Sequence, residues 1–158
     1  MILGALAGGL VGTVVLTTGS RLAQQLGWTR MDIPLLLGTI FTPDRGRATV
    51  VGYAIHFFNG LVFSLAYGLV FEATGEAGWL FGLGLGAVHG AFAGGGLLSV
   101  LLPAVHPRMG KPWTDARDTP LLEPPGFLLS NYGRATLVAT FVLHLAYGAI
   151  VGTFAALS

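Results

Sequence analysis

Apolar residues gather in four long runs along the chain, with polar residues between them. The runs cover residues 1–17, 48–71, 79–104 and 135–157. A bilayer core of about 30 Å needs about 20 helical residues, a length that three runs reach and the first nearly reaches. The pattern therefore predicts an all-α membrane protein with four transmembrane helices in a single domain, 1–158, with no room for a folded soluble domain.

Composition supports this interpretation, because 53% of the residues are hydrophobic and only 9% are charged. A soluble domain carries about 25% charged residues, so lipid is the main solvent of this chain. The net charge of +1 provides no basic patch and predicts no nucleic-acid partner. The lack of cysteine excludes thiolate catalysis and cysteine-ligated metal sites. Arginine far outnumbers lysine, which is typical of a GC-rich bacterial genome, and we expect a bacterial inner-membrane protein.

The basic side chains lie in or directly beside two of the three connections. These are 18–47, with Arg21, Arg30, Arg45 and Arg47, and 105–133, with Arg108, Lys111, Arg117 and the adjacent Arg134. The short second connection holds only the acidic Glu72 and Glu76. Because basic residues favour the cytoplasmic side of a membrane, we expect both long connections in the cytoplasm and both termini outside.

One sequence phrase occurs twice. "DRGRATVVGYAIHFFNG" begins at Asp44 and "NYGRATLVATFVLHLAYG" at Asn131, while "GALAGG" at 4–9 returns as "GAFAGG" at 90–95. The chain is therefore interpreted as two copies of one helical hairpin, 1–72 and 87–158. Since the first helix of each copy runs inward, we predict two parallel-oriented hairpin repeats related by a pseudo-twofold axis along the membrane normal.

Three acidic or amide side chains stand where helices are expected to begin. Asp44 and Asn131 precede the two repeated helices and are predicted N-caps. Asp32 is predicted to cap a short apolar helix with Pro34 in its first turn. That helix is too short to span the bilayer, so we expect it in the interface or under the bundle.

Glycines recur at a spacing of four within the predicted spans. The glycines assigned to helix packing are Gly4, Gly8, Gly12, Gly82, Gly86, Gly90, Gly94, Gly148 and Gly152. Small residues at this spacing form a flat strip on which a neighbouring helix lies closely, the main cohesive device between helices in lipid.

The predicted spans contain no Asp, Glu, Lys or Arg, but three of them each contain one histidine. His56 and His144 occupy matching places in the repeats, followed three residues later by Asn59 or Tyr147. We expect their imidazoles to face each other at a similar depth, which suits a bis-histidine haem, a metal of unspecified identity, a pigment, or two structural hydrogen bonds. His89 is a possible third ligand, expected at a different depth.

No pattern of catalytic residues is present. The spans lack a carboxylate pair and a His-Glu-x-x-His motif, and no serine stands in a nucleophile elbow. We therefore predict a non-enzymatic protein with no catalytic residue. His106, next to Pro107, is expected in water or headgroups without a special role.

The paired H-x-x-[NY]-G words and the "HLAYGAIVG" ending resemble small bacterial inner-membrane proteins with four helices and no assigned activity. The resemblance implies the topology and carries no functional residue over to this chain.

Three functions are compatible with these features. The first is an accessory or scaffolding subunit of a larger membrane complex, with lipid, other subunits or further copies as partners. The second is a cofactor-binding bundle that uses His56 and His144, and the third is a small channel or transporter for neutral solutes.

Overall fold

The structure is a computed structural model that describes residues 1–110 and 121–158. Its helices are α1 (Ile2–Gln25), α2 (Ile33–Gly38), α3 (Arg45–Thr74), α4 (Trp79–Ala91), the π-helix η1 (Phe92–Leu101), α5 (Leu102–Val105), the 3-10 helix η2 (Phe127–Tyr132) and α6 (Thr136–Ala156). The segments α4, η1 and α5 form one helix, Trp79–Val105. This helix, α1, α3 and α6 are each long and apolar enough to cross a membrane, so the described residues confirm the predicted all-helical fold with four candidate spans.

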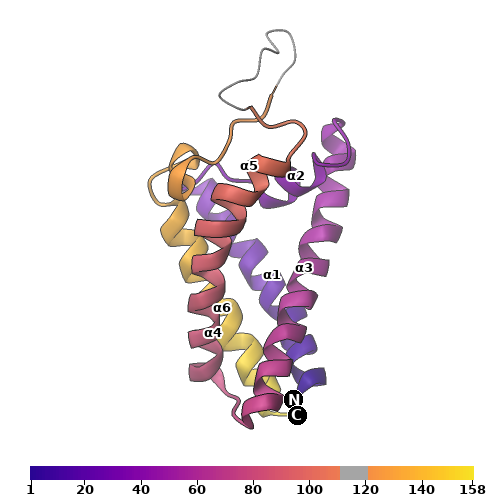
Figure 1. Ribbon diagram of the computed structural model, residues 1–158, viewed down its shortest axis with the longest axis vertical. Coiled ribbons are helices and arrows are strands. Elements are labelled where there is room, and N and C mark those ends of the chain that lie inside the picture. Colours follow the sequence, from indigo (N-terminus) through magenta and orange to yellow (C-terminus); the bar gives the residue numbers. More distant parts are fainter. Residues whose placement is uncertain (111–120) are drawn as a thin grey trace.

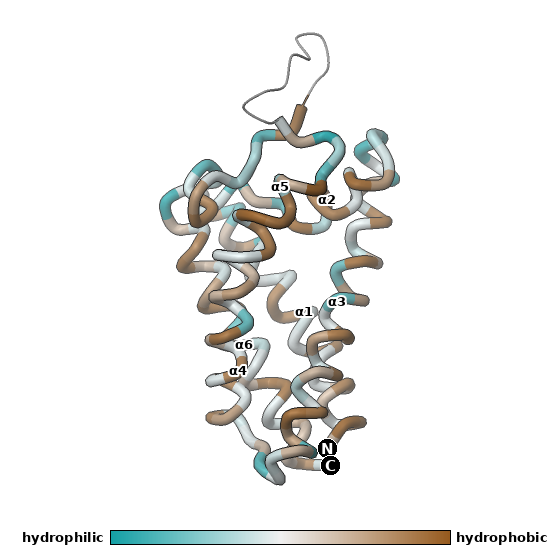
Figure 2. Tube along the Cα trace, viewed as in Figure 1, coloured by the Kyte–Doolittle hydropathy of each residue, from teal (hydrophilic) through white to brown (hydrophobic). Residues whose placement is uncertain are grey.

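The four long helices form an open arrangement. Both termini lie at one end of the molecule, and α2, α5 and η2 lie at the other (Figure 1). The helix α1 packs on α3 and on α6, and α4 packs on α6. The helices α3 and α4 are joined by a short connection but do not pack along their length within the described residues. Hydrophilic residues concentrate at the two ends of the molecule, as an inserted bundle requires (Figure 2).

Close packing on α6 involves all the glycines assigned to packing. A methyl group on Gly82 would meet the backbone of Gly148, and one on Gly86 would meet the backbone of His144. On the other side of α6, Gly8 lies against the backbone of Val151. The backbones therefore approach as closely as van der Waals radii allow, which is how helices cohere in lipid.

The two copies of the repeated glycine motif contact different turns of α6. Gly4 lies against Phe154, whereas the matching Gly90 lies against Phe141 and His144. The internal repeat and its pseudo-twofold axis stay predictions.

Helix ends follow the expected caps in two cases of three. Asp44 Oδ1 accepts a hydrogen bond from the Arg47 N–H at 2.7 Å and begins α3. Asp32 Oδ1 accepts from the Leu35 N–H at 3.1 Å and begins α2. These two predictions are confirmed.

The predicted cap at Asn131 is wrong. The helix α6 begins later, at Thr136, and Asn131 lies within η2, where its side chain donates to the Pro124 carbonyl at 3.0 Å. The reason is a tight reversal before α6, in which Leu128 and Leu129 adopt positive φ and Leu129 becomes fully buried. Leu129 and Tyr132 are buried in a second apolar cluster near α2. The free energy gained by this burial outweighs that of starting α6 earlier.

Gly86→Ala tests the backbone contact between α4 and α6. The new methyl group would collide with the His144 carbonyl, so we expect a loss of about 1–3 kcal/mol in stability, the typical cost of overpacking. Thermal unfolding of the detergent-purified protein measures the loss. Gly84→Ala on the same helix is the matched control, because a methyl group there meets nothing within 4 Å. Equal melting temperatures for the two variants would contradict this packing.

Candidate functional site

A cavity of about 260 Å³ lies between the four long helices, and α2 bounds it at the end away from the termini. Its polar lining residues are Thr13, Ser20, His56, Asn59, His89, Thr140, His144 and Tyr147. The rest of the lining is mainly leucine, isoleucine and other apolar side chains from α1, α2, η1 and α5. No Asp, Glu, Lys or Arg of the described segments lines the cavity. The site is thus an apolar chamber that carries a few uncharged polar groups.

Aromatic rings close the cavity on the side of the termini. The Phe63 ring stacks on the His89 ring with centroids 3.8 Å apart. The Tyr147 hydroxyl donates to the Gly60 carbonyl at 2.5 Å, which joins α6 to α3. Beyond these rings lies the buried cluster that includes Tyr67 and Phe71.

The three intramembrane histidines line this one cavity, from three different helices. The His89 and His144 rings meet edge to face, with centroids 4.6 Å apart. The two rings are thus in direct contact, while the depth of His89 in the membrane stays a prediction. Gly86 and Gly90 allow α4 to lie directly on α6, and that register brings His89 beside His144. The face-to-face arrangement of His56 and His144 across an axis stays a prediction.

A hydrogen bond determines which ring nitrogen of His144 carries the proton. Its Nδ1 lies 2.7 Å from the Thr140 carbonyl, which only accepts hydrogen bonds, so Nδ1 carries the proton. A neutral imidazole has one donor and one acceptor, so Nε2 of His144 is the acceptor. Within the described residues this Nε2 has no hydrogen-bond partner.

Other polar groups around the cavity also lack partners in the described parts of the chain. The side chains of His56 and Asn59 make no hydrogen bond there, and Nδ1 of His89 is buried without one. The nearby Tyr67 hydroxyl is buried and unpaired as well. An unpaired polar group in apolar surroundings costs about 1–3 kcal/mol, and most buried polar groups in proteins have partners. The cavity therefore favours an occupant with hydrogen-bonding groups.

The donor set does not fit a metal ion. Across residues 1–110 and 121–158, no three His, Cys, Asp or Glu side chains gather closely enough to hold one. Two imidazole nitrogens alone specify a metal weakly. An organic molecule with a large apolar part and few polar groups fits the lining better.

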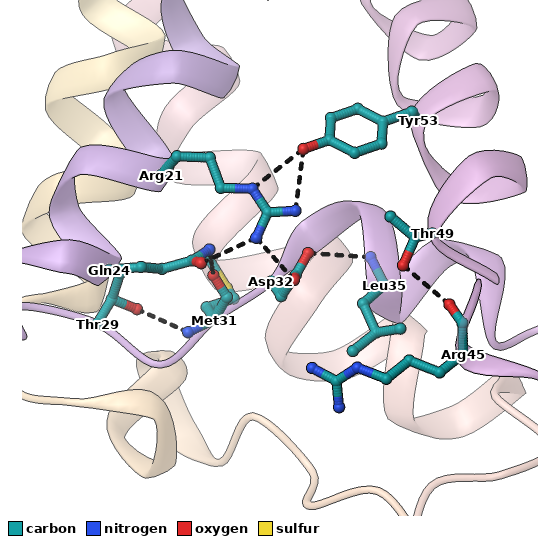
Figure 3. Close-up of polar contacts among 9 residues, drawn as sticks. All are labelled: Arg21, Gln24, Thr29, Met31, Asp32, Leu35, Arg45, Thr49 and Tyr53. Atoms are coloured by element: carbon teal, nitrogen blue, oxygen red, sulfur yellow. Dashed lines mark hydrogen bonds and ion pairs between the residues drawn. The ribbon is translucent and has the colours of Figure 1, made fainter. Parts of the chain in front are cut away.

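An ion-pair network joins α1, α2 and α3 at the end of the bundle where α2 lies (Figure 3). Arg21 donates from Nε to the Tyr53 hydroxyl at 3.0 Å and from Nη1 to the Asp32 carboxylate at 2.9 Å. Gln24 also accepts from Arg21, and it donates to the Met31 carbonyl at 2.6 Å. The network thereby ties α1, α2 and α3 together, one helical turn from His56.

Sequence reasoning placed Arg21 among the cations of a connection and missed this network. The structure continues α1 to Gln25, so Arg21 is helical. Gly9, Thr13, Thr17 and Arg21 recur at a spacing of four. Gly9 and Thr13 face α3, and this periodicity could have placed Arg21 on the same face.

His106 lies between α5 and α2, at the end of the molecule away from the termini. It is only 1% exposed, so the expected position in water or headgroups is wrong. Its Nε2 lies 3.0 Å from the Leu36 carbonyl, and its Nδ1 accepts from the Arg108 N–H at 3.1 Å. Arg108 also donates to the carbonyls of Thr39 and Ile40. These bonds attach the end of the third span to α2, whose side chains line one end of the cavity.

Burial lowers the pKa of His106, and the nearby Arg108 charge lowers it further, while the bond to the Leu36 carbonyl opposes the shift. His106 is therefore neutral in the folded protein at pH 7.

Comparison with protein-family models, curated proteins and solved structures gives no significant match for this chain. The function of the cavity must therefore be inferred from its own chemistry.

Acid should weaken the layer that contains His106. The folded-state pKa lies below the unfolded value of about 6.5, so the unfolded chain binds more protons between the two values. The stabilising contribution is complete above about pH 6.5 and falls as the pH drops toward the lowered pKa. We expect the melting temperature to fall between pH 7.5 and pH 5, and to fall less in His106→Gln. Parallel pH profiles for the two proteins would contradict this role of His106.

Proposed function

We propose that this protein is a non-enzymatic integral membrane protein that binds one uncharged, largely apolar small molecule in the histidine-lined cavity. The observation that carries the proposal is a set of polar side chains, His56, Asn59 and His89, that have no partner among the described residues and lie in a lining to which those residues contribute no charge. Ligand sites in proteins typically combine such an apolar lining with a few polar groups that orient the molecule.

Charge neutrality follows from the lining. A charged ligand would lose its hydration without gaining an opposite charge, which costs several kcal/mol in an apolar site. A neutral molecule with one or two hydrogen-bonding groups instead pairs with the imidazole and amide groups. Of the cofactor-binding alternative, the proposal retains an organic molecule such as a pigment as the ligand.

The two other functions are less well supported. A channel needs a pathway through the bundle, whereas the cavity is bounded by α2 and by the rings of Phe63, His89 and Tyr147. The role as an accessory subunit stays a prediction, because the exposed apolar faces suit lipid and protein equally. The bacterial inner membrane, with both long connections in the cytoplasm, remains our proposal from the distribution of arginines.

Binding of a fluorinated probe tests the proposal. We expect 4-fluorobenzyl alcohol to give a bound fluorine NMR signal with the protein in lipid nanodiscs. Leu97→Trp should weaken binding at least about tenfold, because Leu97 lines the cavity and the larger ring fills it. Val100→Trp is the matched control, since Val100 lies on the same helix and is 66% exposed.

The charge of the probe provides a second comparison. The ammonium analogue 4-fluorobenzylamine should show no saturable binding at neutral pH. Equal binding of both probes, or equal binding by Leu97→Trp and Val100→Trp, would refute the proposed site.

A further inference from the structure

We infer that the bound molecule is a membrane-dissolved long-chain alcohol, which enters the cavity from the lipid between α3 and η1 and donates its hydroxyl hydrogen to Nε2 of His144. The inference rests on the proposed function and names the ligand class of the same cavity.

The side of the bundle between α3 and η1 is open to lipid. The helix α3 packs on α1 and α2, while α4 packs on α6, and no comparable packing joins α3 to η1 in the described residues. Within residues 1–110 and 121–158, the ring contacts between α3 and α4 lie on the side of the termini, where Phe63 stacks on His89 and Phe71 meets Phe81. In Figure 1, α1 is visible in the space between α3 and α4. The cavity lies in this same space and is lined from both sides.

Apolar side chains flank this opening. Leu101 and Val105 line the cavity and are 51% and 60% exposed, so the lining continues onto the lipid-facing surface. An alkyl chain can therefore lie partly in the cavity and partly in the bilayer without exposing polar backbone groups.

Described residues pack across both ends of the cavity. On one side α2 lies backbone to backbone on α3, because a methyl group at Gly52 would meet Pro34 and one at Gly38 would meet Ala48. At this end the ion pair of Arg21 and Asp32 also joins α1 to the N-terminus of α2. On the other side stands the ring cluster of Phe63, His89 and Tyr147. The side between α3 and η1 is therefore the route that we assign to a molecule dissolved in lipid.

The π-helical turn lies on the flank of the opening. It contains three consecutive glycines, and the Ser99 hydroxyl donates to the Gly94 carbonyl at 2.5 Å. π-Helical turns are rare and are frequent at functional sites. The wider turn also carries Leu97 and Leu101, which line the cavity.

The polar end of the ligand is set by His144. Its Nδ1–H is used by the Thr140 carbonyl, so Nε2 needs a hydrogen-bond donor. A hydroxyl donates to Nε2 and keeps its oxygen as an acceptor for another donor of the cavity lining. A carbonyl or ether oxygen only accepts hydrogen bonds and would leave Nε2 of His144 unpaired. The His144 geometry therefore selects a hydrogen-bond donor, and in neutral lipids without nitrogen that donor is a hydroxyl.

A matched pair of photoreactive probes tests the inference. Both carry the same dodecyl chain with a mid-chain diazirine; one ends in a hydroxyl and the other in a methyl ether. With the full chain in nanodiscs, we expect the alcohol to label the cavity lining about tenfold more than the ether, as mapped by mass spectrometry. His144→Phe should remove this preference and retain labelling by the alkyl chain. Leu97→Trp should lose labelling, and Val100→Trp should keep it.

The outcomes separate this inference from the proposed function. If 4-fluorobenzyl alcohol binds but the two dodecyl probes label equally, the cavity binds ligands and the inferred alcohol class is wrong. Labelling that is confined to the outer surface of the helices would overturn the lateral route. If 4-fluorobenzyl alcohol does not bind, the proposed function itself fails. The comparison of the two probes in the unaltered protein does not depend on any variant folding.

Discussion

The structure depends on one contact above all, the close approach of α6 to the glycine faces of α1 and α4. In lipid there is no hydrophobic drive between helices, so van der Waals contact decides which helices associate. Gly82 and Gly86 place the backbone of α4 on that of α6, and Gly8 does the same for α1. With both neighbours bound to α6, α3 is held only by α1 and α2 over most of its length. The space left between α3 and η1 is the cavity.

Polar groups in this bundle fall into two classes with different roles. Arg21, His106 and Tyr147 have all found partners, and their bonds connect helices or fasten α2. Within the described residues His56, Asn59 and His89 have not, and these three line the cavity, while the Tyr67 hydroxyl, also unpaired, lies in the adjacent apolar cluster. A membrane protein gains nothing in stability from unpaired polar groups in an apolar setting. Their concentration at one place is why we assign the site to binding rather than to packing.

Local sequence signals were sufficient where the relevant interaction is local. The caps at Asp32 and Asp44 depend on side chains within three residues of the N–H groups they satisfy, and both were predictable. Asn131 carries the same type of signal, yet the burial of Leu129 moved the start of α6. His106 was misplaced because its partners, Leu36 and Arg108, include a residue from a connection far away in the sequence.

The sequence by itself determined the number of spans, their order and the absence of charge in the middle of the bundle, because these properties depend on hydrophobicity along single helices. It also placed the histidines in three different spans. The tertiary structure alone decided that His89 meets His144, that α3 stands away from η1, and that a cavity lies between them. Those outcomes depend on how far one helix slides along another and which face it presents. In lipid, contacts between small residues of two helices set both, so the glycine spacing of one helix indicates a packing face but not the partner or the register.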